Sequence, residues 1–144
     1  MLYVFIRVMI GSIFLVSGVG KLISPYQNFL YVIQAYQVLP SWGEVLTAQI
    51  FPWIELIVGV FVFLGLWTSW SVRAALVLFG IFVVVVGQAL IRHLPLESCG
   101  CFGGWIHFKP QTVIVLDSIS LLLTFLLLRS LVLTKKFSLD SYFD

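Results

Sequence analysis

The chain has 144 residues, of which 61% are hydrophobic and 10% are charged, and its mean hydropathy is +1.12. A soluble domain is about half apolar and about a quarter charged, so this composition excludes an ordinary soluble enzyme. The net charge of +2 comes from 8 basic and 6 acidic residues scattered along the chain, which excludes a nucleic-acid-binding surface. The composition predicts an integral membrane protein with one compact helical domain.

Four apolar stretches are each long enough to cross a lipid bilayer as a helix, which takes about 20 residues. They cover residues 2–23, 46–66, 72–91 and 112–133, and Pro, Gly and Ser residues that favour turns separate them. Uninterrupted runs of this length do not fit the alternating pattern of β-barrel strands. The first stretch is too long for a signal peptide, contains Arg7 and precedes no clean cleavage site. The sequence therefore predicts an all-α, integral membrane four-helix bundle over residues 1–133, followed by a cytoplasmic tail at 134–144.

The distribution of Lys and Arg predicts which end of the bundle faces the cytoplasm. More basic residues lie toward the side of the N-terminus than toward the opposite side. The first set is Arg7, Arg73, Arg129, Lys135 and Lys136, and the second is Lys21, Arg92 and Lys109. This bias places both termini in the cytoplasm, so the two long connections, residues 24–45 and 92–111, lie outside.

The first outer connection has the pattern of a short amphipathic helix. Ser24 can cap this helix, with Pro25 at its first position. Apolar residues then recur at helical spacing opposite three glutamines: Tyr26, Phe29, Leu30, Ile33, Tyr36 and Leu39 against Gln27, Gln34 and Gln37. We expect this helix to lie on the membrane or over the bundle, either as a lid or anchor or as a gate for a substrate.

Each predicted span has one face of small or polar residues, and four such faces form the interior of a bundle. On the first span, Gly11 and Gly18 share a face with Arg7 and Lys21, and the two glycines allow a neighbouring backbone to come close. The corresponding faces of the other three spans carry Pro52, Glu55, Gly59 and Val62; Gly80 and Gly87; and Asp117, Ser120 and Thr124.

The ionisable residues inside these spans need partners, because a carboxylate at the centre of a span costs about 3 kcal/mol on insertion. Lys21 is the first choice for Glu55, since both lie toward the outer half, and Arg7 is the alternative. Asp117 and Arg92 lie at one level near the outer side, so we expect a second ion pair between them. These charges either lock the bundle or give Glu55 or Asp117 a role in proton relay or in contact with a cofactor head group.

The strongest chemical signal is the pair Cys99 and Cys101, the two cysteines of the chain, separated only by Gly100 in the second outer connection. A disulfide across one residue closes a strained ring, and strained disulfides are more oxidising and more often catalytic than structural ones. Three interpretations are open: a redox-active pair, a metal site with His93 and His107, and an inert or conformational pair. The spacing is not that of a zinc finger, so we expect no bound metal. A nearby histidine or Lys109 lowers a thiol pKa and favours the thiolate.

Taken together, several of these features resemble the MauE branch of the DoxX-like membrane proteins. They are the face from Arg7 to Lys21 and Leu22, Pro25, the stretch from Tyr36 to Pro40, Pro52 with Glu55 and Gly59, and Cys-Gly-Cys-Phe-Gly at 99–103. The resemblance covers roughly residues 4–130, and the cysteine element is its most specific part. It implies a four-helix protein of the bacterial inner membrane associated with thiol redox chemistry.

The resemblance also implies partners and a cofactor. Methylamine-utilisation members are linked, with a thioredoxin-like partner, to disulfide maturation of a periplasmic enzyme, and DoxX relatives are linked to sulfur oxidation with quinone as acceptor. We therefore expect Cys99 and Cys101 to exchange a disulfide with a periplasmic thioredoxin-like protein, with Cys99 attacking first because it lies nearer Arg92 and His93. Glu55, Lys21 and aromatic residues near the outer leaflet are the expected contacts of a quinone. The alternatives are an assembly subunit of a larger membrane complex, in a homo- or hetero-oligomer, and metal handling by the Cys and His residues.

Overall fold

The computed structural model describes residues 2–94 and 109–130, and these residues are helical apart from short connections. The helices are α1 (Leu2–Ile23), α2 (Tyr26–Tyr36), α3 (Ser41–Leu64), α4 (Thr68–Ile91) and α5 (Pro110–Arg129), and no strand occurs among the described residues. By length and composition α1, α3, α4 and α5 can each cross a membrane. The predicted all-α membrane bundle is confirmed, while the tail predicted at 134–144 lies outside the described residues.

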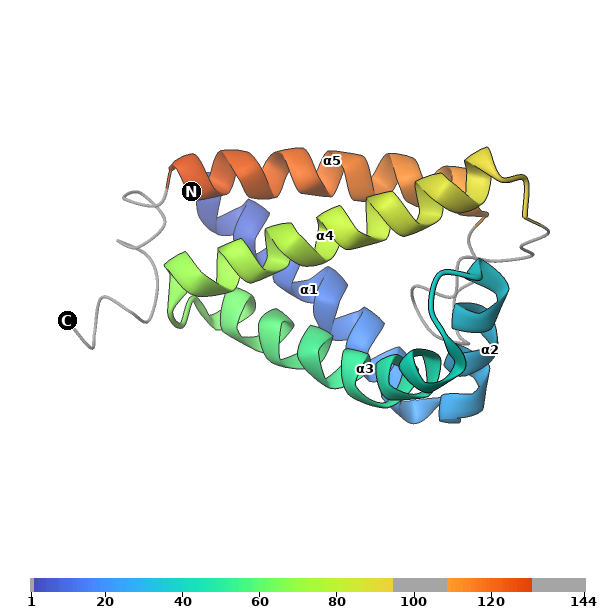
Figure 1. Cartoon of the computed structure of the whole chain (residues 1–144). Coiled ribbons are helices and arrows are strands. Elements are labelled where there is room, and N and C mark those ends of the chain that lie inside the picture. The colour runs from blue at the N-terminus through green and yellow to red at the C-terminus, as the bar shows by residue number, and fades with distance from the viewer. Residues whose placement is uncertain (1, 95–108, 131–144) are drawn as a thin grey trace.

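The four long helices run along one common direction, and the short α2 lies at one end of them (Figure 1). The beginning of α1 and the end of α5 lie together at the opposite end of the bundle. Helix α3 ends and α4 begins at a short turn at that same end, and the two helices diverge toward the end where α2 lies. Gly65, with a φ of 75°, adopts the left-handed conformation that ends α3 at this turn.

Several helices begin earlier than hydropathy predicts, because each helix extends beyond its apolar stretch into more polar residues. Helix α3 starts at Ser41 rather than at 46, and its first turn contains Glu44, whose negative charge is favourable at a helix N-terminus. Helix α4 starts at Thr68 rather than at 72. In α2 the prediction was wrong by one position, since Pro25 occupies the cap and the helix starts at Tyr26.

Glycines bring α1 and α3 into close contact, as predicted for the first span. A Cβ atom on Gly11 would lie 2.7 Å from the backbone nitrogen of Phe63, and one on Gly18 would lie 2.9 Å from that of Leu56. Gly59 of α3 makes the reciprocal contact with the backbone of α1. Gly80 has no such role, because a Cβ atom there would meet nothing within 4 Å. The glycines of α1 and α3 therefore mediate packing between two helices of the same chain.

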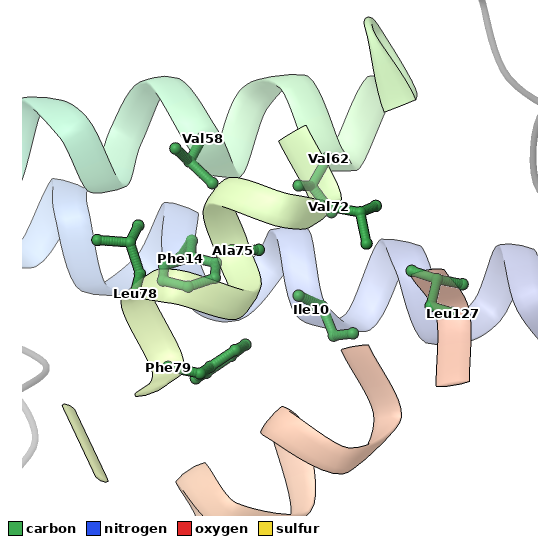
Figure 2. Close-up of a cluster of buried hydrophobic side chains, with 9 residues drawn as sticks. All are labelled: Ile10, Phe14, Val58, Val62, Val72, Ala75, Leu78, Phe79 and Leu127. Carbon is green, nitrogen blue, oxygen red and sulfur yellow. The ribbon is translucent and has the colours of Figure 1, made fainter. Parts of the chain in front are cut away.

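An apolar core fills the half of the bundle nearer the α3–α4 turn, and we call this region the packed half (Figure 2). All four long helices contribute to it: Ile10 and Phe14, Val58 and Val62, Val72, Ala75, Leu78 and Phe79, and Leu127. The rings of Phe14 and Phe79 have their centroids 4.7 Å apart. A second, smaller apolar cluster of Tyr36, Val86, Ala89 and Val113 lies at the other end, the α2 end, which also holds buried polar groups.

Candidate functional site

A buried ion pair joins α1 to α3 at the α2 end of the bundle. Lys21 Nζ lies 2.8 Å from Glu55 Oε2 and 2.9 Å from Glu55 Oε1, and both side chains are 0% exposed. Ser17, one turn before Lys21, accepts a hydrogen bond from Nζ at 3.1 Å and donates one to Glu55 Oε1 at 3.3 Å. The predicted pairing of Glu55 with Lys21 is confirmed. The three ammonium protons of Lys21 thus have three acceptors, which is what a charge removed from water requires.

Three phenylalanine rings surround the same ammonium group. Lys21 Nζ lies 4.8 Å from the ring centroid of Phe29, 5.3 Å from that of Phe82 and 5.7 Å from that of Phe51. The negative faces of aromatic rings attract a cation within about 6 Å. The rings come from α2, α4 and α3, so no spacing along the chain could have indicated this cluster. We call it the aromatic cage.

A cavity of about 350 Å³ lies beside the aromatic cage. Its lining comes mainly from α2, α3 and α4, and consists of Lys21, Phe29, Val32, Ile33, Tyr36, Val38, Leu39, Thr47, Phe51, Ile81, Phe82, Val85 and Val86. Apolar and aromatic side chains dominate, with Lys21 as the charged group. Glu55 is absent from this lining, so it holds Lys21 in place and does not face the cavity. The size and the lining are typical of a small-molecule pocket with few polar groups.

Helix α2 forms one wall of this cavity and is fastened to the end of α4. Gln88 Nε2 donates a hydrogen bond to the carbonyl oxygen of Tyr36 at 3.2 Å. The guanidinium of Arg92 donates to the carbonyl oxygen and to Oε1 of Gln37, each at 3.5 Å, and to Gln88 Oε1 at 3.2 Å. Burial of Tyr36, with a smaller contribution from the charge of Asp117, raises the pKa of its hydroxyl to about 12. Of the two predicted positions, α2 therefore lies over the bundle.

The predicted ion pair between Arg92 and Asp117 is wrong. Arg92 is exposed just beyond the end of α4, where Gln37 and Gln88 accept its hydrogen bonds. Asp117 is 4% exposed and faces the interior, and its Oδ2 atom has no hydrogen-bond partner among the described residues. A shared level in the membrane was not enough, because one side chain lies outside the bundle and the other inside it.

The remaining predicted residues are dispersed or lie outside the described part of the chain. Arg7 is buried on α1, four turns from Lys21. Glu55 pairs with Lys21, so the alternative pairing of Glu55 with Arg7 is not formed. His93 is exposed after α4, with a φ of 53° in the left-handed region. Cys99, Cys101 and His107 lie outside the described residues. Within residues 2–94 and 109–130, no cluster of three or more His, Cys, Asp or Glu side chains could hold a metal ion.

The described helix ends on either side of the cysteine segment lie close to the candidate site. Helix α4 ends and α5 begins at the α2 end of the bundle (Figure 1). Residues 95–108, which contain both cysteines, connect these two points. The segment is therefore attached at the end that contains the Lys21–Glu55 pair and the cavity.

Comparison with known proteins gives one match. The family model described as "Methylamine utilisation protein MauE" matches residues 1–132. No curated protein and no solved structure matches the chain. The match supports the MauE part of the resemblance noted in the sequence, and the wider relationship to DoxX-like proteins stays a prediction.

Proposed function

This chain belongs to the family of the methylamine utilisation protein MauE, and on that premise we propose that it is a membrane thiol–disulfide oxidoreductase component. Cys99 and Cys101 exchange a disulfide with a periplasmic thioredoxin-like protein, and electrons pass between this pair and a membrane quinone. One observation carries the proposal: the cysteine segment is attached to the end of the bundle that contains an apolar cavity beside a fixed buried cation.

The thiol chemistry needs only the two cysteines and the partner. The Cys99 thiolate attacks a sulfur of the partner's disulfide, a mixed disulfide forms, and the displaced partner thiolate takes up a proton. Cys101 then attacks Cys99, which releases the second partner thiolate and leaves the Cys99–Cys101 disulfide. Two electrons have passed from this chain to the partner, and every step is reversible. Cys99 attacks first because Arg92 and His93 lie nearer to it along the chain, and positive charge stabilises a thiolate.

The cavity fits a neutral, flat ring better than it fits an ion. Its walls are apolar, and the charge of Lys21 is already balanced by Glu55. Phe29, Phe51 and Phe82 would hold the ring, and the cation in their midst would add a fixed positive potential on one side. A quinone, when bound, supplies two-electron and two-proton redox chemistry that thiols can exchange with.

The bacterial cytoplasmic membrane is the proposed location, with both termini in the cytoplasm and the cysteine segment in the periplasm. The chain supports this arrangement in two ways. The beginning of α1 and the end of α5 lie at one end of the bundle. The sequence adds Lys135 and Lys136 after α5, and this excess of basic residues favours the cytoplasmic side for that end.

Thiol trapping in intact cells tests the proposal. A membrane-impermeant, mass-shifting maleimide should label the cysteines only after prior reduction, because an extracytoplasmic disulfide protects them. Removing the membrane quinone should then shift the balance between the oxidised and reduced pair, and the direction of the shift gives the direction of electron flow. Labelling only after lysis, or an unchanged redox state without quinone, would overturn the topology or the quinone link respectively.

Substitution of the cysteines separates the chemistry from assembly. Cys99→Ser and Cys101→Ser should each abolish disulfide exchange while the protein still inserts, and Ser98→Ala serves as the neighbouring control. Full activity in the double cysteine variant would end the proposal. Cysteines that stay unreactive in both redox states, in a protein that copurifies tightly with other subunits, would favour an assembly subunit. Metal in the purified protein would favour metal handling.

A further inference from the structure

The charges inside the α2 end of the bundle do not balance. Lys21 of α1 and Glu55 of α3 form a fully buried, mutually neutralising pair. Asp117 of α5 is 4% exposed, interacts electrostatically with both of them, and has an Oδ2 atom without a hydrogen-bond partner in the described part of the chain. Two buried carboxyl groups therefore share one buried cation, and that cation is already in contact with both oxygens of Glu55.

Among the described residues, the other groups around Asp117 offer no second cation. Arg7 of α1 is buried, but it lies four turns from Lys21, toward the opposite end of the bundle. The buried Tyr36 of α2 has a hydroxyl that stays neutral, since its pKa is raised to about 12. On α4, the long helix packed most closely against α5, Arg73 lies near the opposite end and Arg92 just past the last turn, and both are exposed. On α5 itself, Lys109 and Arg129 flank the two ends of the helix and are exposed as well.

A buried carboxylate with an unpartnered oxygen and no cation in contact is very unfavourable in a membrane interior, and such a group takes up a proton instead. We propose that Asp117 is a proton-carrying group, which holds a proton beside the Lys21–Glu55 pair at neutral pH and can release it when the charge around Lys21 changes. Among the described residues, the ammonium of Lys21 is the buried cation that can stabilise the ionised form of Asp117. Asp117 and Glu55 thus compete for a single cation.

This inference deepens the proposed function and rests on it for its biological use. Oxidation of two thiols to a disulfide releases two electrons and two protons, and reduction of a quinone to a quinol takes up both. Asp117 can store one of these two protons within the bundle between the two half-reactions. The proton site itself needs neither the cysteines nor a quinone, so it can be tested alone.

Infrared spectroscopy of the purified full-length protein in lipid nanodiscs tests it. A protonated buried carboxyl group gives a carbonyl band, separate from the amide bands, that shifts in D₂O. We expect the wild-type protein to show one such group per chain at pH 7. Asp117→Asn should remove the band, and Glu44→Gln, which removes a carboxyl group from the first turn of α3, should leave it unchanged.

Two further variants test the competition for Lys21. In Glu55→Gln the freed ammonium pairs with Asp117, so the band should disappear although Asp117 is present. In Lys21→Met both carboxyl groups lose their cation, so the band should double. If Glu55→Gln or Lys21→Met fails to fold, the near-isosteric Asp117→Asn still decides.

The proposal is overturned if the wild-type protein lacks the band or if the band survives in Asp117→Asn. A band in a protein whose cysteines prove inert would refute the proposed function alone. An active cysteine pair in a protein without the band would refute the proton site alone.

Discussion

The packed half and the α2 end of the bundle are built from the same four helices but enclose different kinds of side chain. In the packed half, apolar side chains from all four helices meet, and the glycines of α1 and α3 let the two backbones approach closely. At the α2 end, the buried Lys21, Glu55 and Asp117 side chains and a cavity of about 350 Å³ lie between the helices. Close packing in one half of the bundle thus supports a polar, partly hollow site in the other.

The largest expected effect comes from breaking the ion pair at the α2 end. Glu55→Leu removes the carboxylate that Lys21 contacts and leaves its ammonium only Asp117 as a counter-ion, so the unfolding free energy should fall by up to about 3–5 kcal/mol. Replacing both partners, as Lys21→Met with Glu55→Leu, should restore most of this loss because no uncompensated charge is left. Unfolding in mild detergent measures both variants. A double variant no more stable than Glu55→Leu would show that the pair stabilises the bundle in some other way.

The second prediction concerns alkaline pH and Tyr36. Burial raises the pKa of its hydroxyl from 10.0 to about 12 in the folded protein. The stability that the neutral hydroxyl contributes is therefore complete below pH 10 and is lost as the pH rises through about 12, a fall on the order of 2–3 kcal/mol. Tyr36→Phe should remove this part of the decline, whereas Tyr31→Phe, at a tyrosine that is 74% exposed, should not. Identical pH profiles for the wild type and Tyr36→Phe would contradict the assignment.

A smaller effect distinguishes two glycines. Gly11→Ala forces a Cβ atom to within 2.7 Å of the α3 backbone and should destabilise the protein by about 1–3 kcal/mol. Gly80→Ala makes no such contact, and the gain in helix propensity of up to about 1 kcal/mol should leave the protein as stable as the wild type or more so. Equal costs at both positions would mean that the packed half does not depend on close contact between α1 and α3.

The smallest effect is expected where α2 is fastened. Arg92→Gln removes exposed hydrogen bonds to Gln37 and Gln88, so the unfolding free energy should change by less than about 1 kcal/mol. The amides of α2 should nevertheless exchange hydrogen faster, because Arg92 holds its C-terminal end. Arg73→Gln is the matched loss of charge at the opposite end of α4 and should leave exchange in α2 unchanged. If exchange in α2 does not respond to Arg92→Gln, packing around Tyr36 alone holds the helix.

Much of the architecture could be predicted, because length and hydropathy decide whether a helix crosses a bilayer. The pairing of Lys21 with Glu55 was predictable for a related reason: each needs an opposite charge, and each lies at the same depth. The same argument failed for Arg92 and Asp117, because depth says nothing about which way a side chain points. Arg92 follows the last turn of its helix and reaches water, whereas Asp117 faces inward.

Aromatic residues near Lys21 and Glu55 were expected, but which ones form the aromatic cage could not be predicted from the sequence. Phe29, Phe51 and Phe82 come from three helices, and the chain contains 13 phenylalanines among which nothing singles them out. Only the relative rotation and divergence of the helices bring the three rings to one ammonium group. The cysteine pair is the opposite case: the motif at 99–101 predicts redox chemistry from the sequence, without any structural observation of these residues.

The chain order of the buried charges bears on how the protein enters the membrane. Lys21 is synthesised first, Glu55 follows 34 residues later, and their helices make the closest helix–helix approach through glycine. When Glu55 is inserted, its counter-ion is thus already present in a helix that the ribosome has delivered. Asp117 is translated last and arrives where the only buried ammonium in its surroundings is engaged. Biosynthesis alone would assign the cation to Glu55 and leave Asp117 to acquire its proton during insertion.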